Sequence, residues 1–229
     1  MAEMAIGYGS EFQLLRYLGH HRQDLNQAII DQLKIESGEI QWVDYPVNLN
    51  RDSMDGEYKG VECFKNSIDI DYQKLQEEWK KFWPQSGNSQ NWDGIFTIGN
   101  KWYFVEAKAH LDEAYQKCQA TSKQSIDQII KAFEKATGDS VKAEKWFKSD
   151  CYQLANRLAF IHFCKENGIK AELVYILFIN GYRINTKKNV CDKQKWQELM
   201  EEEFKILDLP KKLKEKVGIV YIDCKKGKQ

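Results

Sequence analysis

The dipeptide Gly99-Asn100, which stands between two β-type runs, constrains the fold of this chain more than any other feature of its sequence. The runs span residues 93–98 and 101–108, and only those two residues join them. Gly-Asn between such runs is typical of a tight β-hairpin, because both residues tolerate positive φ angles. A two-residue turn also fixes the pairing register, so each residue of the first strand faces one defined residue of the second.

Two carboxylates face each other at one end of this hairpin. The register places Asp93 directly across from Glu106, and the alternation of side chains puts Lys108 on the same face as Glu106. Opposed Cβ atoms lie about 5 Å apart, and two carboxylates at that distance repel by roughly 3 kcal/mol at an effective dielectric near 20. The pair therefore needs a shared proton, the Lys108 ammonium, or a hard divalent cation. A surface hairpin whose charges face water is the alternative.

Periodic segments on both sides of the hairpin indicate an α/β fold. Helical spacing occurs at about 10–18, 22–34, 71–83, 121–136, 150–166 and 192–205, with a short helix starting at Pro210. Further strands are expected at 39–47, 171–179 and 218–223, and the second of these is almost continuously apolar, as in a buried central strand. We expect one domain over residues 1–229, a mixed sheet of four to five strands flanked by helices on both faces, the hairpin at 92–109 and a charged C-terminal segment at 192–229.

Composition narrows the class of protein further. Charged residues make up 30% and apolar residues 42% of the 229 residues, which excludes a disordered or fibrous chain. No apolar run approaches the roughly 20 residues of a membrane helix, and no leader segment is recognisable, so we expect a soluble, cytoplasmic protein. Lys plus Arg equals Asp plus Glu at 34 each, so net charge neither favours nor excludes a polyanionic partner. The six cysteines form no CxxC pair and are expected in the core, with a zinc site at His162 and Cys164 as a minor alternative.

The hairpin residues resemble the signature of a known enzyme superfamily. Asp93, a spacing of twelve residues and then Glu106-Ala107-Lys108 are similar to the motif of the restriction-endonuclease-like, or PD-(D/E)xK, nucleases. A helix before the sheet and a helix–strand pair after the hairpin are also similar. One position departs from the pattern, because Trp92 stands where the motif often has proline. The resemblance implies a restriction-endonuclease-like fold and a metal-dependent nuclease acting on DNA.

The resemblance also implies roles for individual residues. Asp93 and Glu106 would bind Mg²⁺ or Mn²⁺, with the Ala107 carbonyl as a further ligand, and Lys108 would position or activate the attacking water. Glu11, near the start of the first helix, matches an additional acid that many members carry on the helix before the sheet. The alternative for Glu11 is a favourable interaction with the helix dipole.

Three polar residues form a seam on the helix expected at 150–166. Gln153, Asn156 and Arg157 lie at positions i, i+3 and i+4 of a segment that is otherwise apolar over most of its circumference. Polar groups on a buried helix need partners. We expect this seam to line the site or to contact substrate phosphate, and an exposed helix face is the alternative.

Other features leave room for several partners. The lysines near the C-terminus are expected on a solvated face, with nucleic-acid contact as the alternative. The tryptophans are expected mostly in the core, although Trp83 and Trp92 could stack on bases. His110 could contact substrate, and an ordinary loop histidine is the alternative. The leading hypothesis is a Mg²⁺- or Mn²⁺-dependent nuclease that hydrolyses DNA. The alternatives are a catalytically inactive module of the same fold that binds nucleic acid or a protein partner, and a hydrolase of a small phosphorylated substrate. A homodimer or a larger complex is compatible with the sequence.

Overall fold

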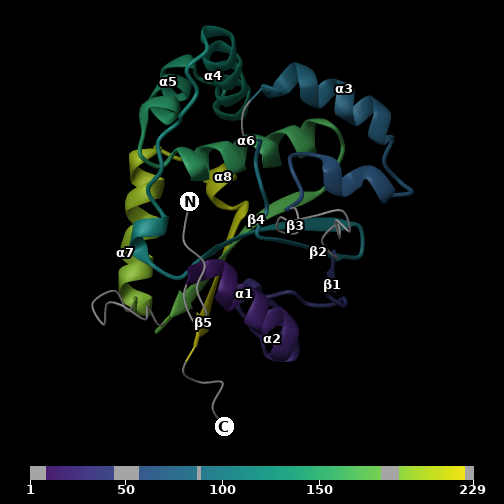
Figure 1. Ribbon diagram of the computed structural model, residues 1–229, viewed down its shortest axis with the longest axis vertical. Coiled ribbons are helices and arrows are strands. Elements are labelled where there is room, and N and C mark those ends of the chain that lie inside the picture. Colours follow the sequence, from purple (N-terminus) through teal and green to yellow (C-terminus); the bar gives the residue numbers. More distant parts are fainter. Residues whose placement is uncertain (1–8, 44–56, 87–88, 182–190, 225–229) are drawn as a thin grey trace, which may run out of the picture.

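A computed structural model of the chain describes residues 9–43, 57–86, 89–181 and 191–224 (Figure 1). Its centre is a five-stranded mixed sheet with the strand order β1-β2-β3-β4-β5. The strands are β1 (Gln41–Trp42), β2 (Gly94–Ile98), β3 (Lys101–Lys108), β4 (Ala171–Ile179) and β5 (Val217–Asp223). The pairs β1–β2 and β2–β3 are antiparallel, whereas β4 runs parallel to both β3 and β5. The expected α/β class with a mixed sheet is therefore confirmed.

Helices lie on both sides of this sheet. They are α1 (Gly9–His20), α2 (Arg22–Leu33), α3 (Tyr72–Phe82), α4 (Lys123–Thr137), α5 (Ser140–Lys148), α6 (Tyr152–Glu166), α7 (Lys193–Ile206) and α8 (Lys211–Lys214), with 3₁₀ turns at Glu62–Asn66 and Leu111–Glu113. Helices α1 and α2 cover one face, and α6 lies on the other face with α3, α4 and α5 outside it (Figure 1). Among the described residues, no helix has the length and apolar character needed to cross a membrane.

The hairpin has the register that the sequence predicts. Ile98 pairs with Lys101 and Gly94 pairs with Val105, so the two strands meet through a two-residue turn. Gly99 takes a φ of 58°, which a residue without a Cβ adopts at little cost. Asn100 keeps a negative φ, so the turn needs positive φ at only one of its two positions, not at both.

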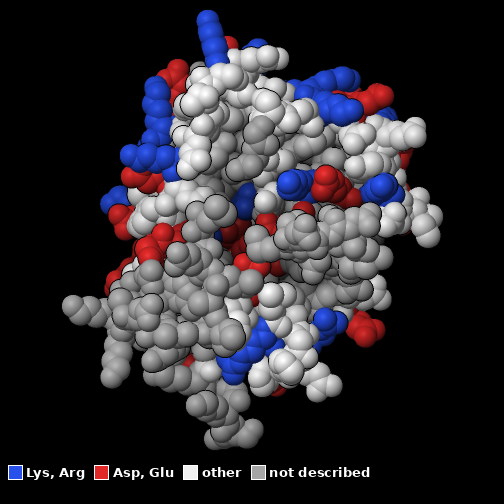
Figure 2. All heavy atoms as spheres, viewed as in Figure 1, with Lys and Arg blue, Asp and Glu red and all other residues white. Residues whose placement is uncertain are grey.

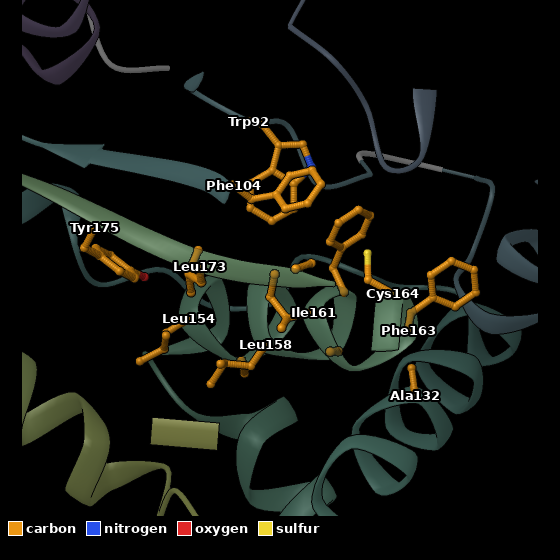
Figure 3. Close-up of a cluster of buried hydrophobic side chains, with 14 of the residues drawn as sticks. Trp92, Phe104, Ala132, Leu154, Leu158, Ile161, Phe163, Cys164, Leu173 and Tyr175 are labelled. Carbon is orange, nitrogen blue, oxygen red and sulfur yellow. The ribbon is translucent and has the colours of Figure 1, made fainter. Parts of the chain in front are cut away.

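Alternate side chains of β3 pack into two separate apolar clusters, one on each face of the sheet. Phe104 belongs to the cluster under α6, whereas Tyr103 and Val105 belong to the cluster under α1 and α2. Figure 3 shows the α6 cluster, where Trp92 and Phe104 from the hairpin meet side chains of α6 and β4. The same alternation places Glu106 and Lys108 on the α6 side, next to the β4 residue Tyr175, which pairs with Glu106 across the sheet.

Several expectations from the sequence are wrong or lie outside the described residues. The strand expected at 39–47 covers only 41–42, and its last four residues are outside the described part of the chain. Trp83 and Trp92 are 3% and 0% exposed and fill the core under α6, as expected for most of the tryptophans, so the alternative that they stack on bases is wrong. Residues 225–229, with three of the C-terminal lysines, are not described.

Candidate active site

The candidate site lies where β2 begins and β3 ends. Asp93 immediately precedes β2, and Glu106 and Lys108 occupy the carboxyl end of β3, beside the carboxyl end of the parallel strand β4. Glu106 and Lys108 are only 2% and 5% exposed, so they are buried charges and not part of a solvated surface hairpin. Figure 2 shows acidic and basic side chains meeting in a hollow near the middle of this face of the molecule.

Glu106 holds two cations, one on each carboxylate oxygen. Lys108 Nζ donates to Oε1 at 2.6 Å, and Arg157 Nε donates to Oε2 at 2.8 Å. Burial alone would raise the pKa of Glu106, but Lys108 and Arg157 outweigh it and lower that pKa below its usual value. Glu106 is therefore an ionised carboxylate at neutral pH, and two different elements supply its counter-charges.

The Arg157 guanidinium is held by protein groups on all three of its nitrogens. Besides Glu106, it donates to Asn156 Oδ1 at 3.0 Å and to the Asn91 carbonyl oxygen at 2.7 Å. Its Cζ atom lies 4.8 Å from the centre of the Trp92 ring, within range of a cation–π contact. Arg157 is 6% exposed, so this arrangement makes it a positioning residue for Glu106, and its predicted contact with substrate phosphate stays a prediction.

Asp93 faces a different environment from Glu106. Its Oδ2 accepts a hydrogen bond from the Ala107 backbone N–H at 2.7 Å. Burial, and then the nearby Glu106 charge, raise the pKa of Asp93 to about 8, although Lys108 and the Ala107 N–H act in the opposite direction. The repulsion predicted between the two acids is thus relieved in two ways, by a proton on Asp93 and by the Lys108 ammonium on Glu106.

Two further acids, Glu57 and Glu203, surround this pair, and the sequence analysis missed both. Burial raises the pKa of Glu57, which hydrogen-bonds Asn91 and feels the charges of Glu11 and Glu106. Burial, together with the Glu106 charge, raises the pKa of Glu203 to about 8 against the opposing effect of Lys108. Glu203 is the last of three consecutive glutamates, a pattern typical of a solvent-exposed helix face.

The remaining site residues predicted from the sequence differ in their burial and in their contacts with the acidic cluster. Glu11 is exposed in the first turn of α1, and its charge acts on the Glu57 carboxyl group. Gln153 and Asn156 are half-buried on α6, and Gln153 Oε1 is buried without a hydrogen-bond partner among the described residues. His110 is 1% exposed, so it cannot contact substrate without a rearrangement.

The donor chemistry of the site suits a hard divalent cation. Asp93 and Glu106 offer carboxylate oxygens, and the four acids around the site outnumber its two cations, Lys108 and Arg157. In the ranges that the structure describes, however, no three His, Cys, Asp or Glu side chains already converge as a ligand group. Metal binding therefore requires that Asp93 lose its proton and that the metal ion either share the Glu106 oxygens with Lys108 and Arg157 or displace one of these two cations.

Comparisons with known proteins add no assignment. No protein-family model, curated protein or solved structure matches this chain. The class that the fold and site define is therefore an α/β protein with a buried acid–lysine–arginine cluster at the carboxyl end of its central parallel strands.

A hollow of about 860 Å³ lies elsewhere, at the turn end of the hairpin. Trp42, Asn100 and Lys170 are among its lining residues, and Asp93 and Glu106 are not. Because the ionisable groups with shifted pKa values gather at the opposite end of β3, we place the candidate chemistry there and not in this hollow.

Proposed function

We propose that this protein is a metal-dependent nuclease that hydrolyses phosphodiester bonds in DNA. One observation carries the proposal: half-buried Asp93 and buried Glu106 lie together at one end of a hairpin, with Lys108 bound to Glu106 on the same strand face. The order of elements is compatible with it, because α1 precedes the sheet and α6 and β4 follow the hairpin. These are the features that resemble the PD-(D/E)xK nucleases.

Each residue of the cluster has a role in this proposal. Asp93 and Glu106 would hold Mg²⁺ or Mn²⁺, with the Ala107 carbonyl oxygen as a further ligand. A bound divalent ion polarises the scissile phosphate and lowers the pKa of a water molecule. Lys108 would orient the attacking water and offset negative charge on the phosphate. Arg157 keeps Glu106 ionised and fixes the direction of its carboxylate.

The test is cleavage of supercoiled plasmid and linear DNA by the full chain with Mg²⁺ or Mn²⁺. We expect cleavage by the wild type, no cleavage in EDTA, and a loss of about 100-fold or more in Lys108→Ala, since a positioned proton-transfer group contributes about that much. Lys101→Ala is the matched control, because Lys101 begins the same strand and pairs with Glu172 far from the site. Equal cleavage by the wild type and Lys108→Ala would overturn the proposal.

One observation favours a second candidate, the catalytically inactive module that binds nucleic acid or a protein partner. Both oxygens of Glu106 are already neutralised by Lys108 and Arg157, so the fold is electrostatically satisfied without a metal. Under this alternative, Mn²⁺ titration gives no binding at millimolar concentration, while DNA binding persists and weakens with salt. Mn²⁺ binding that disappears in Asp93→Ala would exclude it.

A further inference from the structure

Glu203 has a buried carboxyl oxygen with no hydrogen-bond partner among the described residues. The residue is 2% exposed, and its Oε2 atom makes no hydrogen bond to any described residue. Buried carboxyl oxygens are normally hydrogen-bonded, because stripping water from them without replacement is costly. Helix α7 packs against β4 next to Lys108, because Trp196, which is buried on α7 like Glu203, bonds the Phe178 carbonyl oxygen, and Lys108 pairs with the preceding β4 residue, Leu177. The charges of Lys108 and Glu106 act on the Glu203 carboxyl group.

Lys108 has unused hydrogen-bond donors among the described residues. An ammonium group has three donors, and Lys108 uses one of them, on Glu106 Oε1, in the part of the chain that is described. Lys108 is 5% exposed, so little water is available to the other two. A buried donor with spare protons therefore lies within electrostatic range of a buried acceptor with a spare oxygen.

The position of Glu203 is fixed by the packing of α7. Trp196 Nε1 donates to the Phe178 carbonyl oxygen at 3.0 Å, and Trp146 Nε1 donates to the Leu207 carbonyl oxygen at 2.7 Å. These bonds tie both ends of α7 to its neighbours. Glu203 shares the buried side of this helix with Trp196, so its carboxyl group is presented to the sheet by a rigid element.

We propose that Glu203 is a positioning residue for Lys108. When a divalent cation engages Glu106, the Lys108 ammonium leaves that carboxylate and binds the Glu203 carboxylate, whose proton passes to solvent, so that the ammonium stays beside the reaction centre. This inference rests on the proposed function, since it describes how the same site changes when it is loaded. Without Glu203, the displaced ammonium would face a divalent cation with no counter-charge of its own.

A double-mutant cycle on metal affinity tests this inference without relying on activity. Mn²⁺ is titrated calorimetrically into metal-free full-length wild type, Glu203→Gln, Lys108→Met and the double variant. We expect Glu203→Gln to weaken Mn²⁺ binding by about 10- to 100-fold in the wild-type background, as loss of an outer-shell partner does. In the Lys108→Met background the same change should cost less than about twofold, because no ammonium then needs the carboxylate.

Two further variants keep the result interpretable. Glu202→Gln alters the exposed neighbour of Glu203 on α7 and should leave Mn²⁺ affinity unchanged. Glu203→Asp retains the charge and should restore most of the affinity lost in Glu203→Gln, which a purely structural role would not predict. Circular dichroism of every variant reports whether the fold is intact.

The outcomes separate this inference from the proposed function. Wild-type Mn²⁺ affinity in Glu203→Gln, or an equal loss in both backgrounds, would overturn the role of Glu203 while DNA cleavage by the wild type still supports a nuclease. A wild-type protein that neither binds Mn²⁺ nor cleaves DNA would overturn both proposals.

Discussion

At the scale of single residues, Arg157 contributes to stability as well as to the site. Its side chain joins α6 to Glu106 and to the Asn91 carbonyl oxygen, and it lies over the Trp92 ring. Removing one partner of a buried ion pair leaves the other charge without compensation, which typically costs about 3 kcal/mol or more. We expect Arg157→Leu to lower the free energy of unfolding by about that amount in urea denaturation.

The control for Arg157 is an arginine outside the core. Arg22 is exposed, and its side chain donates to the Leu18 carbonyl oxygen. Arg22→Leu should change the free energy of unfolding by less than about 0.5 kcal/mol. Similar losses in the two variants would contradict the idea that Arg157 stabilises the fold through Glu106.

The pKa of Asp93 predicts how stability depends on pH. Its folded-state pKa of about 8 lies above the value of an unfolded aspartate, so between about pH 4 and pH 8 the folded protein binds more protons than the unfolded one. Stability from this group is therefore complete below pH 4 and is lost as pH rises toward 8. Glu203 acts in the same direction, because its pKa is also raised to about 8.

Asp93→Asn isolates this contribution, because asparagine keeps an oxygen for the Ala107 N–H and cannot ionise. In metal-free buffer the wild type should lose up to about 1.4 kcal/mol of unfolding free energy per pH unit through Asp93 between pH 5 and pH 8. We expect a shallower slope in Asp93→Asn and higher stability than the wild type at pH 8. Urea unfolding at pH 5.0, 6.5 and 8.0 measures both, and parallel slopes would show that Asp93 does not carry the effect.

At the scale of secondary-structure elements, one side chain covers the outer edge of the sheet. Gln32 on α2 donates from Nε2 to the Tyr221 carbonyl oxygen at 2.9 Å, and its Oε1 accepts from the Tyr221 N–H at 3.0 Å. This pair of bonds imitates a neighbouring strand and occupies backbone groups of β5 that are otherwise open to pairing with another chain.

Gln32→Ala should therefore affect both stability and association. The expected loss is about 1 kcal/mol of unfolding free energy, as for a side chain–backbone hydrogen-bond pair near the surface, with increased self-association of the variant. Light scattering and urea denaturation measure these two effects. Gln27→Ala removes a glutamine from the exposed side of the same helix, where it bonds Asp31, and should show neither effect.

Elements defined by local signals were predictable, and elements defined by distant partners were not. The hairpin follows from its two-residue turn, and β4 follows from an apolar run with the same bounds as the strand, 171–179. The strand β1 is two residues long. Its bounds could not be predicted, because they are set by pairing with β2, which no local pattern encodes. Helix α5 was missed although Asp139 caps its start through bonds to two backbone N–H groups.

The candidate site divides in the same way. Asp93, Glu106 and Lys108 could be placed from one turn, because register and alternation are local rules. The polar seam on α6 indicated that Arg157 needs a partner, but the sequence did not identify that partner as Glu106. Glu203 comes from a helix far along the chain, and only its spacing from Trp196 on the buried side of α7 marked it.

At the scale of the whole molecule, metal binding should be visible as a change in thermal stability. A ligand that binds only the folded state stabilises it by about 2.7 kcal/mol at a concentration of 100 times its Kd. For a chain of 229 residues, each kcal/mol shifts Tm by about 2–4 °C, so saturating Mn²⁺ should raise Tm by about 5–10 °C. Part of this gain offsets deprotonation of Asp93, so the shift should be larger at pH 8 than at pH 6.

Asp93→Ala should abolish that shift, whereas Asp69→Ala, which removes an exposed acid at the turn end of the hairpin, away from the candidate site, should retain it. Differential scanning fluorimetry with MnCl₂ and with EDTA measures both variants beside the wild type. A shift that survives in Asp93→Ala would place the cation elsewhere on the surface. The dependence on pH then distinguishes the buried pair from such a surface site, because an exposed aspartate is already ionised at pH 6 and would give equal shifts at both pH values.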